Sequence, residues 1–234
     1  MKLITFLLII FLTYSGISQP IRDTALLMRD LRYMEKNKIP IKTISFSPYG
    51  NWIIIFGDFG YSYNKIPKSA ASLLLRLNKE QKKIKDFEFY ADSGWVCIFE
   101  HNGFAYKLIP YSLAKALKKL NLNKKNIQAL EIFDNHWAII FENNRTLIKA
   151  NDKKIIRFLL RLKYSKQKIK TIRFFNNGWI ILYGKNSYIA KNPPEDLLIT
   201  LKQLKKLNYT IDNISIYKNF WFIIYNKFNF KTNL

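Results

Sequence analysis

The sequence is poor in cysteine, histidine and acidic residues, and the shortage of cysteine excludes two kinds of structure. Cys97 is its single cysteine, so neither an internal disulfide nor a metal site of several cysteines can form. The 234 residues include two histidines, and the 39 Lys and Arg residues far outnumber the 16 Asp and Glu residues. Because 49% of the residues are hydrophobic, the chain can bury a core and does not have the composition of a disordered protein. We therefore expect a folded, strongly basic protein that needs no disulfide partner.

The first nineteen residues, MKLITFLLIIFLTYSGISQ, have the form of a secretory signal. Lys2 precedes an apolar run over residues 3–12, and the small residues Gly16 and Ser18 stand two apart, as signal peptidase requires. At roughly 15 mainly apolar residues, the segment is shorter than the ~20 that a membrane anchor needs. We expect a signal peptide over residues 1–18 and a mature chain that begins at Gln19 and is exported, either to the periplasm or out of the cell.

The formal net charge of +23 predicts an attraction to polyanions. Nucleic acid, an acidic glycan, lipopolysaccharide and an anionic membrane surface all carry the required charge. The alternative is that the lysines, which are spread along the whole chain, only solvate the surface of the fold. The charge by itself does not distinguish these two interpretations.

The tryptophans mark a tandem repeat. They are spaced by 43, 42, 42 and 42 residues, at Trp52, Trp95, Trp137, Trp179 and Trp221. An isoleucine precedes each tryptophan by ten or eleven residues, which defines units that start at Ile41, Ile84, Ile127, Ile169 and Ile211. A phenylalanine or tyrosine follows each tryptophan by four residues. Residues 19–234 are therefore expected to form a single repeat domain, and the tryptophans are expected to be its structural marks.

Each unit has the pattern of three strands followed by a helix. In the first unit IKTISFS alternates in polarity, WIIIF is apolar at every position, and YSYNKI alternates again. The unbroken apolar run predicts a middle strand that is covered on both faces and begins at the tryptophan. PKSAASLLLRLNKEQKK then changes to helical spacing, with Leu73, Leu74 and Leu77 on one face and Pro67 in the first turn. In the third unit, Asn151 is the expected N-cap of the helix.

The two ends of the repeat domain complement each other. A helical segment over residues 20–38 has no strands before it, and the strands around Trp221 have no helix after them. A closed ring requires this complementarity, because the first helix must complete the last unit. We therefore predict an α+β repeat protein whose five pseudo-symmetric units of three antiparallel strands and one helix close into a propeller-like ring. The alternative is an open βββα solenoid with capped ends.

The pattern W-x-x-x-[FY]…G-[YF]…[IL]-P resembles the propeller-type repeats of secreted bacterial proteins. The resemblance covers nearly all of the mature chain, concerns architecture alone, and implies no activity. It weakens in the third unit, where Arg145 replaces the glycine and Ala150 stands at the position assigned to the proline. A five-fold α/β ring also resembles the guanidine-modifying penteins, which depend on a cysteine with histidine and acidic partners. Cys97 lies inside the apolar segment WVCIF without such partners, so that activity is not implied.

Reactive side chains are not grouped in the sequence, so we expect no catalytic residue, no metal and no cofactor. The repeat places His101 and His136 at opposite ends of a strand. Asp58, Glu100 and Glu142 follow the middle strands of the first three units, where a partial ring of carboxylates would bind a cation. The alternative for these carboxylates is a set of solvated turns.

Two surfaces are candidates for binding. The third strands carry aromatic rings that would stack on sugars or bases if they faced solvent, namely Tyr61, Tyr63, Phe104, Tyr106 and Tyr188. The basic segments NKEQKKIK, NLNKKN and KYSKQKIK recur where helices lead into strands, and equivalent junctions of a ring lie on one rim.

The function we expect is that of a secreted, monomeric, non-catalytic binding or scaffold module for an anionic surface polymer, either a glycan or lipopolysaccharide. A hydrolase or transferase with an unrecognised site is the first alternative. Nucleic-acid binding inside the cell is the second, and it requires the N-terminal signal to be false.

The signal sequence makes a direct prediction about the mature protein. N-terminal sequencing of the protein recovered from outside the cytoplasm should begin within a few residues of Gln19, because Gly16 and Ser18 supply the small residues of the cleavage site. Recovery of a cytosolic protein that retains Met1 would contradict export.

Overall fold

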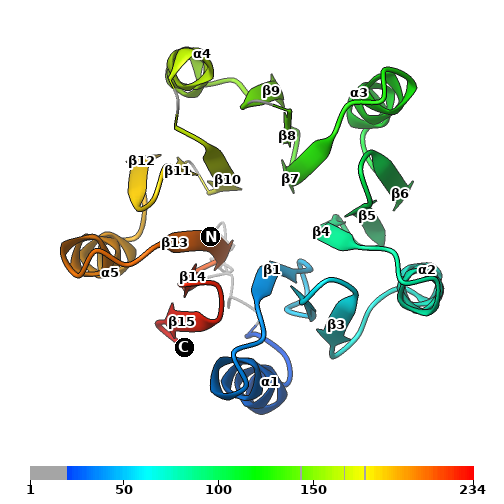
Figure 1. Ribbon diagram of the computed structural model, residues 1–234, viewed down its shortest axis with the longest axis horizontal. Coiled ribbons are helices and arrows are strands. Elements are labelled where there is room, and N and C mark those ends of the chain that lie inside the picture. The colour runs from blue at the N-terminus through cyan, green and yellow to red at the C-terminus, as the bar shows by residue number, and fades with distance from the viewer. Residues whose placement is uncertain (1–19, 143, 166, 177) are drawn as a thin grey trace, which may run out of the picture.

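The computed structural model describes residues 20–142, 144–165, 167–176 and 178–234, so the predicted signal peptide lies outside the described residues. Five repeated units lie around a common centre, each with three antiparallel strands and one helix, which confirms the predicted content of the unit (Figure 1). The first strand of each unit is innermost and the helices form the outer edge (Figure 1). Among the described residues, no helix has the length and apolarity needed to cross a membrane.

The bounds of the elements repeat from unit to unit. The helices are α1 (Thr24–Lys36), α2 (Lys68–Lys79), α3 (Tyr111–Leu122), α4 (Lys153–Tyr164) and α5 (Glu195–Lys206). The first strands are β1 (Ile41–Phe46), β4 (Ile84–Tyr90), β7 (Ile127–Phe133), β10 (Ile169–Phe175) and β13 (Ile211–Tyr217). The middle strands are β2 (Trp52–Phe56), β5 (Gly94–Phe99), β8 (His136–Phe141), β11 (Gly178–Tyr183) and β14 (Phe220–Tyr225). The third strands are β3 (Gly60–Tyr63), β6 (Gly103–Lys107), β9 (Arg145–Lys149), β12 (Ser187–Lys191) and β15 (Asn229–Thr232).

Each unit contributes a separate three-stranded sheet, and over the described residues no sheet closes on itself. The first and middle strands pair antiparallel with a register shift near the start of the first strand, as between Ile41 and Thr43 in the first unit. The same shift occurs in all five units.

Two details differ from the sequence predictions. Helix α1 covers residues 24–36 rather than 20–38, and the middle strand begins one residue before the tryptophan in every unit but the first.

The middle strands bury both of their faces, which explains the unbroken apolar run. In β2, Trp52 and Ile54 pack in the hydrophobic cluster around α1. Ile53 and Ile55 point the other way and pack in the next cluster, against α2 and the second unit. Because successive side chains of a strand point to opposite faces, one strand serves two cores. The five clusters therefore alternate with the five sheets around the ring.

The repeated tryptophans are buried, with exposed fractions from 0% for Trp52 to 7% for Trp137. Each indole N–H donates a hydrogen bond to the start of the helix that precedes its unit. The acceptors are Arg22 O for Trp52 (2.9 Å), Ser69 Oγ for Trp95 (3.2 Å), Ser112 Oγ for Trp137 (3.1 Å), Asp152 Oδ2 for Trp179 (3.1 Å) and Asp196 Oδ2 for Trp221 (2.8 Å). Tryptophan suits this position because it combines a large apolar surface with one donor that needs a partner.

Neighbouring units are joined by side chains that bond to the main chain of the next unit. Lys42 Nζ donates to Ile84 O at 2.7 Å, which links the first unit to the second. Ser215 Oγ donates to Ile44 O at 2.5 Å, which links the last unit to the first. We call the junctions between neighbouring units seams. The main chain adds a further link at four of the five seams: Ile84 N donates to Asp58 O, Ile127 N to His101 O, Ile211 N to Lys185 O and Ile41 N to Lys227 O. At the seam of the third and fourth units, Ile169 N donates to the side chain of Asn144 instead. The seam between the last and first units therefore has the same types of contact as the others.

The first helix lies in that last seam. Leu27, Leu31 and Met34 of α1 pack with Ile41 of the first unit and with Phe222 of the last unit. Helix α2 occupies the equivalent place between the first and second units. The N-terminal helix therefore contacts the C-terminal strands.

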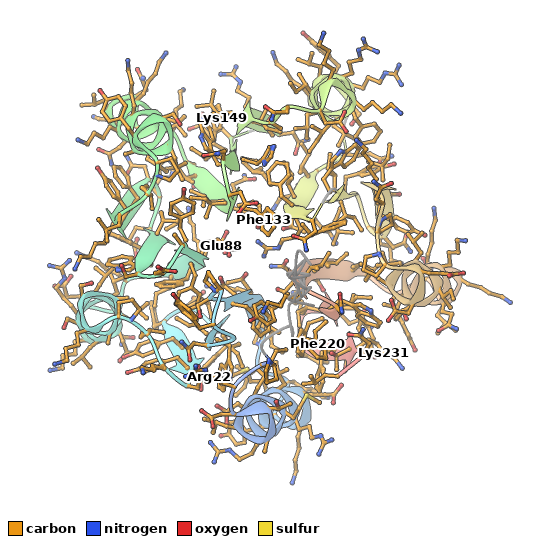
Figure 2. All side chains as sticks on the ribbon, turned by 180° about the vertical axis from the view of Figure 1, so that it is seen from behind. Arg22, Glu88, Phe133, Lys149, Phe220 and Lys231 are labelled. Carbon is orange, nitrogen blue, oxygen red and sulfur yellow. The ribbon has the colours of Figure 1, made fainter. Side chains whose placement is uncertain are left out.

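Arg173, on β10, lies at the centre and contacts every other unit. Its Nη2 donates to Thr43 Oγ1 at 3.0 Å and to Asn213 Oδ1 at 3.2 Å. Its Nη1 donates to Glu88 Oε1 at 2.5 Å and also to Glu131 Oε2. Glu88, labelled in Figure 2, lies toward the centre of the ring. We call Arg173, Glu88, Glu131 and the buried Asp86 the central cluster.

The central cluster holds three carboxyl groups and one guanidinium in a buried place. Burial raises the pKa of Asp86, and together with repulsion from Glu131 it holds the pKa of Glu88 well above its ordinary range. Burial also raises the pKa of Glu131, to about 6. Burial alone would lower the pKa of the guanidinium, but the surrounding carboxylates raise it above its ordinary value. Arg173 therefore stays charged, while the carboxyl groups take up protons more readily than they do in an unfolded chain.

This arrangement predicts an unusual dependence of stability on pH. Since the folded pKa of Glu131 and Glu88 exceeds the unfolded value, the folded state binds protons more tightly, and the free energy of unfolding should rise as the pH falls from about 8 to about 5. Denaturant unfolding at the two pH values should show the rise. The double variant Glu88→Gln, Glu131→Gln should lose most of it, whereas the exposed Glu80→Gln should keep it. Arg173→Met should lower the free energy of unfolding by about 3–5 kcal/mol near pH 8. A wild-type protein that is equally stable at both pH values would contradict this view of the cluster.

Candidate functional site

The aromatic residues predicted for a binding face are half-buried against the hydrophobic clusters. Tyr61 and Tyr63 stack on each other with ring centroids 6.1 Å apart and pack toward α2. Phe104 and Tyr106 form an equivalent pair at 5.9 Å beside α3. Tyr188 packs in the cluster of α5. These side chains of the third strands thus pack on the neighbouring core and keep part of their surface exposed.

The carboxylates after the middle strands contact the residues that lead into first strands, those of their own unit for Glu100 and Glu142 and those of the next unit for Asp58. Glu100 accepts a hydrogen bond from Lys83 N at 2.5 Å, and Glu142 accepts one from Asn126 N at 3.0 Å. Asp58 pairs with the Lys83 ammonium at 3.1 Å, which lowers the pKa of the carboxyl. In the described part of the chain, no group of three or more His, Cys, Asp or Glu side chains could hold a metal ion.

The remaining reactive side chains lie apart. Cys97 is buried in β5, and burial raises the pKa of its thiol, which keeps it protonated. His101 lies in the turn after β5, whereas His136 begins β8. These three side chains therefore do not form a nucleophile and base pair in this arrangement.

Lysines gather at the C-terminal ends of the helices. The helices appear nearly end-on in Figure 1 and follow one another in equivalent units, so their C-terminal ends lie on one face of the ring. We call the lysines of these ends and of the junctions that follow the basic rim. They are Lys36, Lys38, Lys79, Lys82, Lys83, Lys119, Lys124, Lys125, Lys163, Lys168, Lys205 and Lys206.

Part of the basic rim is paired and part is not. Lys82 pairs with Glu80 at 2.7 Å and Lys125 with Glu142 at 3.4 Å. Among the described residues, Lys79, Lys119 and Lys124 make no ion pair with a carboxylate, and all three are exposed. Nitrogen-tipped side chains also surround the perimeter of the ring (Figure 2). The rim therefore combines paired lysines with exposed lysines that make no ion pair.

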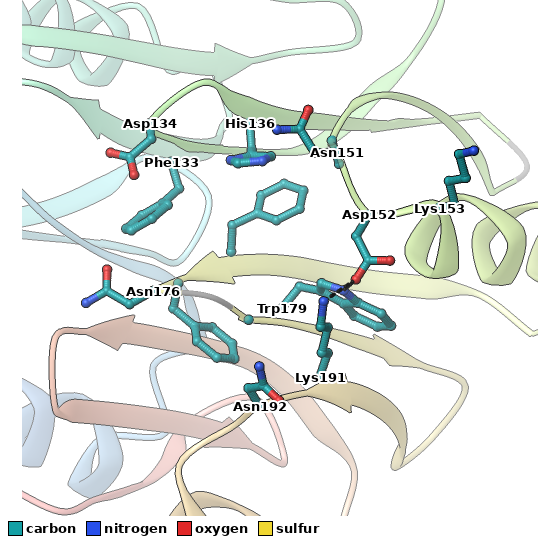
Figure 3. Close-up of a pocket in the computed structure, with 14 residues that line it drawn as sticks. Phe133, Asp134, His136, Asn151, Asp152, Lys153, Asn176, Trp179, Lys191 and Asn192 are labelled. Carbon is teal, nitrogen blue, oxygen red and sulfur yellow. Dashed lines mark hydrogen bonds and ion pairs between the residues drawn. The ribbon is translucent and has the colours of Figure 1, made fainter.

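A pocket of about 840 Å³ lies at the opposite end of α4, between the third and fourth units. Its sides are the β7–β8 and β10–β11 turns and the segment that leads into α4 (Figure 3). The floor is formed by Phe174, Gly178 and Trp179, which are buried. Phe133, His136, Ala150, Asp152 and Phe175 form half-buried walls, and the exposed residues of the mouth are Asp134, Asn151, Lys153, Asn176, Lys191 and Asn192.

Asp152 organises one side of the pocket. Its Oδ2 accepts hydrogen bonds from Trp179 Nε1 at 3.1 Å and from Lys191 Nζ at 2.9 Å, and these three side chains meet in Figure 3. Its Oδ1 accepts one from Lys154 N at 2.8 Å, as an N-cap does. The bond from Trp179, with those from Lys154 and Lys191, lowers the pKa of the carboxyl to about 2. The carboxylate is therefore ionised and fixed in place.

Two sequence predictions for this segment are wrong. The N-cap of α4 is Asp152 rather than Asn151, and Asp152 rather than Ala150 occupies the position held by Pro67, Pro110 and Pro194 in the other units. The expected alignment was displaced because no proline marks the helix start here. The missing proline is the sequence feature that sets the start of this helix apart from the other units, and the pocket lies beside it.

A smaller pocket of about 400 Å³ occupies the equivalent seam between the first and second units. It is lined by Arg22, Tyr49, Asn51, Phe89 and Asp92 among others.

No family model matches the chain, and no curated protein matches it in sequence. Among solved structures it is weakly similar to a propeller-like protein, described as YCF48 bound to D1 peptide, with 9% sequence identity and a TM-score of 0.31. The match covers 80% of this chain and 49% of the other, so the chain spans about half the length of that protein. At this TM-score the similarity supports no conclusion about function.

Proposed function

We propose that the protein is an exported, non-catalytic binding module that attaches to an anionic surface polymer, an acidic glycan or lipopolysaccharide, through the basic rim. The observation that carries the proposal is the repetition of lysines at all five helix ends on one face of the ring. A polymer that lies on this face meets cations from several units at once.

The physical basis is multivalent electrostatic attraction. Each contact between an exposed lysine and an anionic group is weak and screened by salt. Several contacts on one rigid scaffold add up, because after the first contact the others form at a high effective concentration. The excess of Lys and Arg over Asp and Glu also draws the polymer toward the protein before contact.

Binding of the mature protein to lipopolysaccharide, heparin, duplex DNA and neutral dextran, at low and at high salt, tests the proposal. We expect lipopolysaccharide or heparin to bind, dextran not to bind at the rim, and raised salt to weaken the binding. The variant with Lys119, Lys124, Lys163 and Lys168 changed to glutamate should bind at least about tenfold more weakly, which corresponds to about 1.4 kcal/mol.

The matched control changes the same number of charges away from the basic rim, at Lys65, Lys68, Lys107 and Lys149, and should bind nearly as well as the wild type. If both variants lose affinity equally, the net charge and not the rim is responsible, and the proposal fails. If DNA binds far more tightly than the other polymers, the nucleic-acid alternative replaces it.

We further propose that the scaffold is a closed, propeller-like ring. The contacts of α1 with the last unit and the hydrogen bonds from Ser215 to Ile44 and from Asn213 to Lys42 support this. In such a ring no unit is terminal, so each has a neighbour on both sides.

Deletion of residues 20–38 distinguishes the ring from an open solenoid. In a ring the deletion uncovers the apolar faces of the first and last units, and hydrogen exchange should quicken throughout the domain. In a solenoid the far end contacts its own neighbours alone and keeps its protection. Unchanged protection over residues 221–230 would refute closure.

A further inference from the structure

We propose that the pocket between the third and fourth units is a second binding site, and that its ligand is an uncharged sugar residue. The site is separate from the basic rim. Helix α4 spans residues 153–164, so its two ends are roughly 18 Å apart at 1.5 Å per residue. The pocket lies at the N-terminal end and the rim at the C-terminal end. The inference therefore does not depend on the function proposed for the rim.

The size and shape of the pocket suit a small ligand. Its volume of about 840 Å³ lies within the roughly 300–1,000 Å³ of typical small-molecule sites. The smaller pocket in the equivalent seam has less than half this volume. A single sugar residue fills part of the larger pocket. Where it belongs to a longer glycan, the adjoining sugar residues can extend out through the mouth.

Aromatic rings form the interior of the pocket. The His136 and Phe174 rings lie 5.6 Å apart at an angle of 34°, and Phe133 and Phe175 form walls from the two adjacent hairpins. The C–H face of a pyranose ring is apolar, and it packs well on aromatic surfaces of this kind.

The mouth is polar, and the charges of the mouth and of the adjacent wall balance. Asp134 and Asp152 oppose Lys153 and Lys191 among the lining residues. Lys191 is held by Asp152, so the charge of its ammonium is already compensated. This balance disfavours a phosphate or carboxylate ligand, which would need uncompensated cations. The side-chain amides of Asn151 and Asn176 have both donors and acceptors, which suits hydroxyl groups, since each hydroxyl also does both.

Gly178 is required for this geometry. A Cβ atom on Gly178 would lie 2.2 Å from the Phe175 ring and 2.5 Å from Lys191 O. Any other residue would push apart the wall and the strand that carries Lys191. The equivalent position before the tryptophan is Asn51 in the first unit and Phe220 in the last. Gly94 holds this position in the second unit and is packed just as closely, with 2.5 Å from its Cβ position to Tyr90 O. Close packing at this position is therefore shared by the second and fourth units.

The experiment titrates the mature protein with glucose, galactose, N-acetylglucosamine, glucuronic acid and adenosine, and follows binding by NMR. We expect at least one neutral sugar to bind with little dependence on salt, and glucuronic acid and adenosine to bind more weakly. Ala150→Phe fills the pocket and should weaken binding at least about tenfold. Leu108→Phe changes the corresponding position of the second unit and should leave it unchanged.

Two further variants, His136→Ala and Asn151→Ala, test the site even if the Ala150→Phe protein does not fold. Each should weaken sugar binding several-fold while the thermal unfolding midpoint stays close to that of the wild type. The rim variant should keep its affinity for the sugar, so failure of the rim proposal and failure of this one are distinguishable. The inference is overturned if no neutral sugar binds, if binding survives Ala150→Phe in a folded protein, or if the charged sugar or adenosine binds best.

Discussion

One buried cation links all five units at their centre. Arg173 reaches a residue of each of the other four units, through Thr43, Glu88, Glu131 and Asn213. Taking a guanidinium and several carboxyl groups out of water is costly, and apolar side chains of similar volume often give an equally stable protein. The five units have nearly the same apolar faces, and the central cluster is where they differ. The equivalent inward positions hold Ser45, Glu88, Glu131, Arg173 and Ser215, which differ in charge and hydrogen bonding.

The five units share the sequence pattern of their outer parts and differ in the residues at the centre. The outer part repeats because each middle strand must fill two hydrophobic clusters, as Ile53 and Ile54 do. The indole hydrogen bonds repeat as well, although their acceptors vary from a backbone carbonyl to serine and aspartate. The differences between units lie at the surface and at the centre, where the inward residues pair with partners that differ from one unit to the next.

This division explains how much the sequence could predict. The tryptophan spacing, the doubly buried middle strand and the leucine stripe of α2 are local patterns, and they predicted the content of each unit. The central cluster was not predicted, because Arg173 and Thr43 are 130 residues apart and meet only when the units are in place. The pocket was missed for a related reason. It forms between two hairpins of different units, and the misplaced proline equivalent concealed the role of Asp152. The aromatic residues of the third strands were singled out by type, but their half-buried packing depends on the neighbouring helix.

The likeness of the last seam to the others also bears on chain connectivity. Four seams are crossed by the polypeptide and the fifth is not, yet the fifth has the hydrogen bond from Ile41 to Lys227 that its counterparts have between Ile84 and Asp58 and between Ile127 and His101. The position of the two termini is therefore arbitrary with respect to the packing. A circularly permuted gene, with the present ends joined by a short linker and new ends placed in another seam, encodes the same set of contacts. If the ring is closed as proposed, such a permuted protein should fold to the same structure.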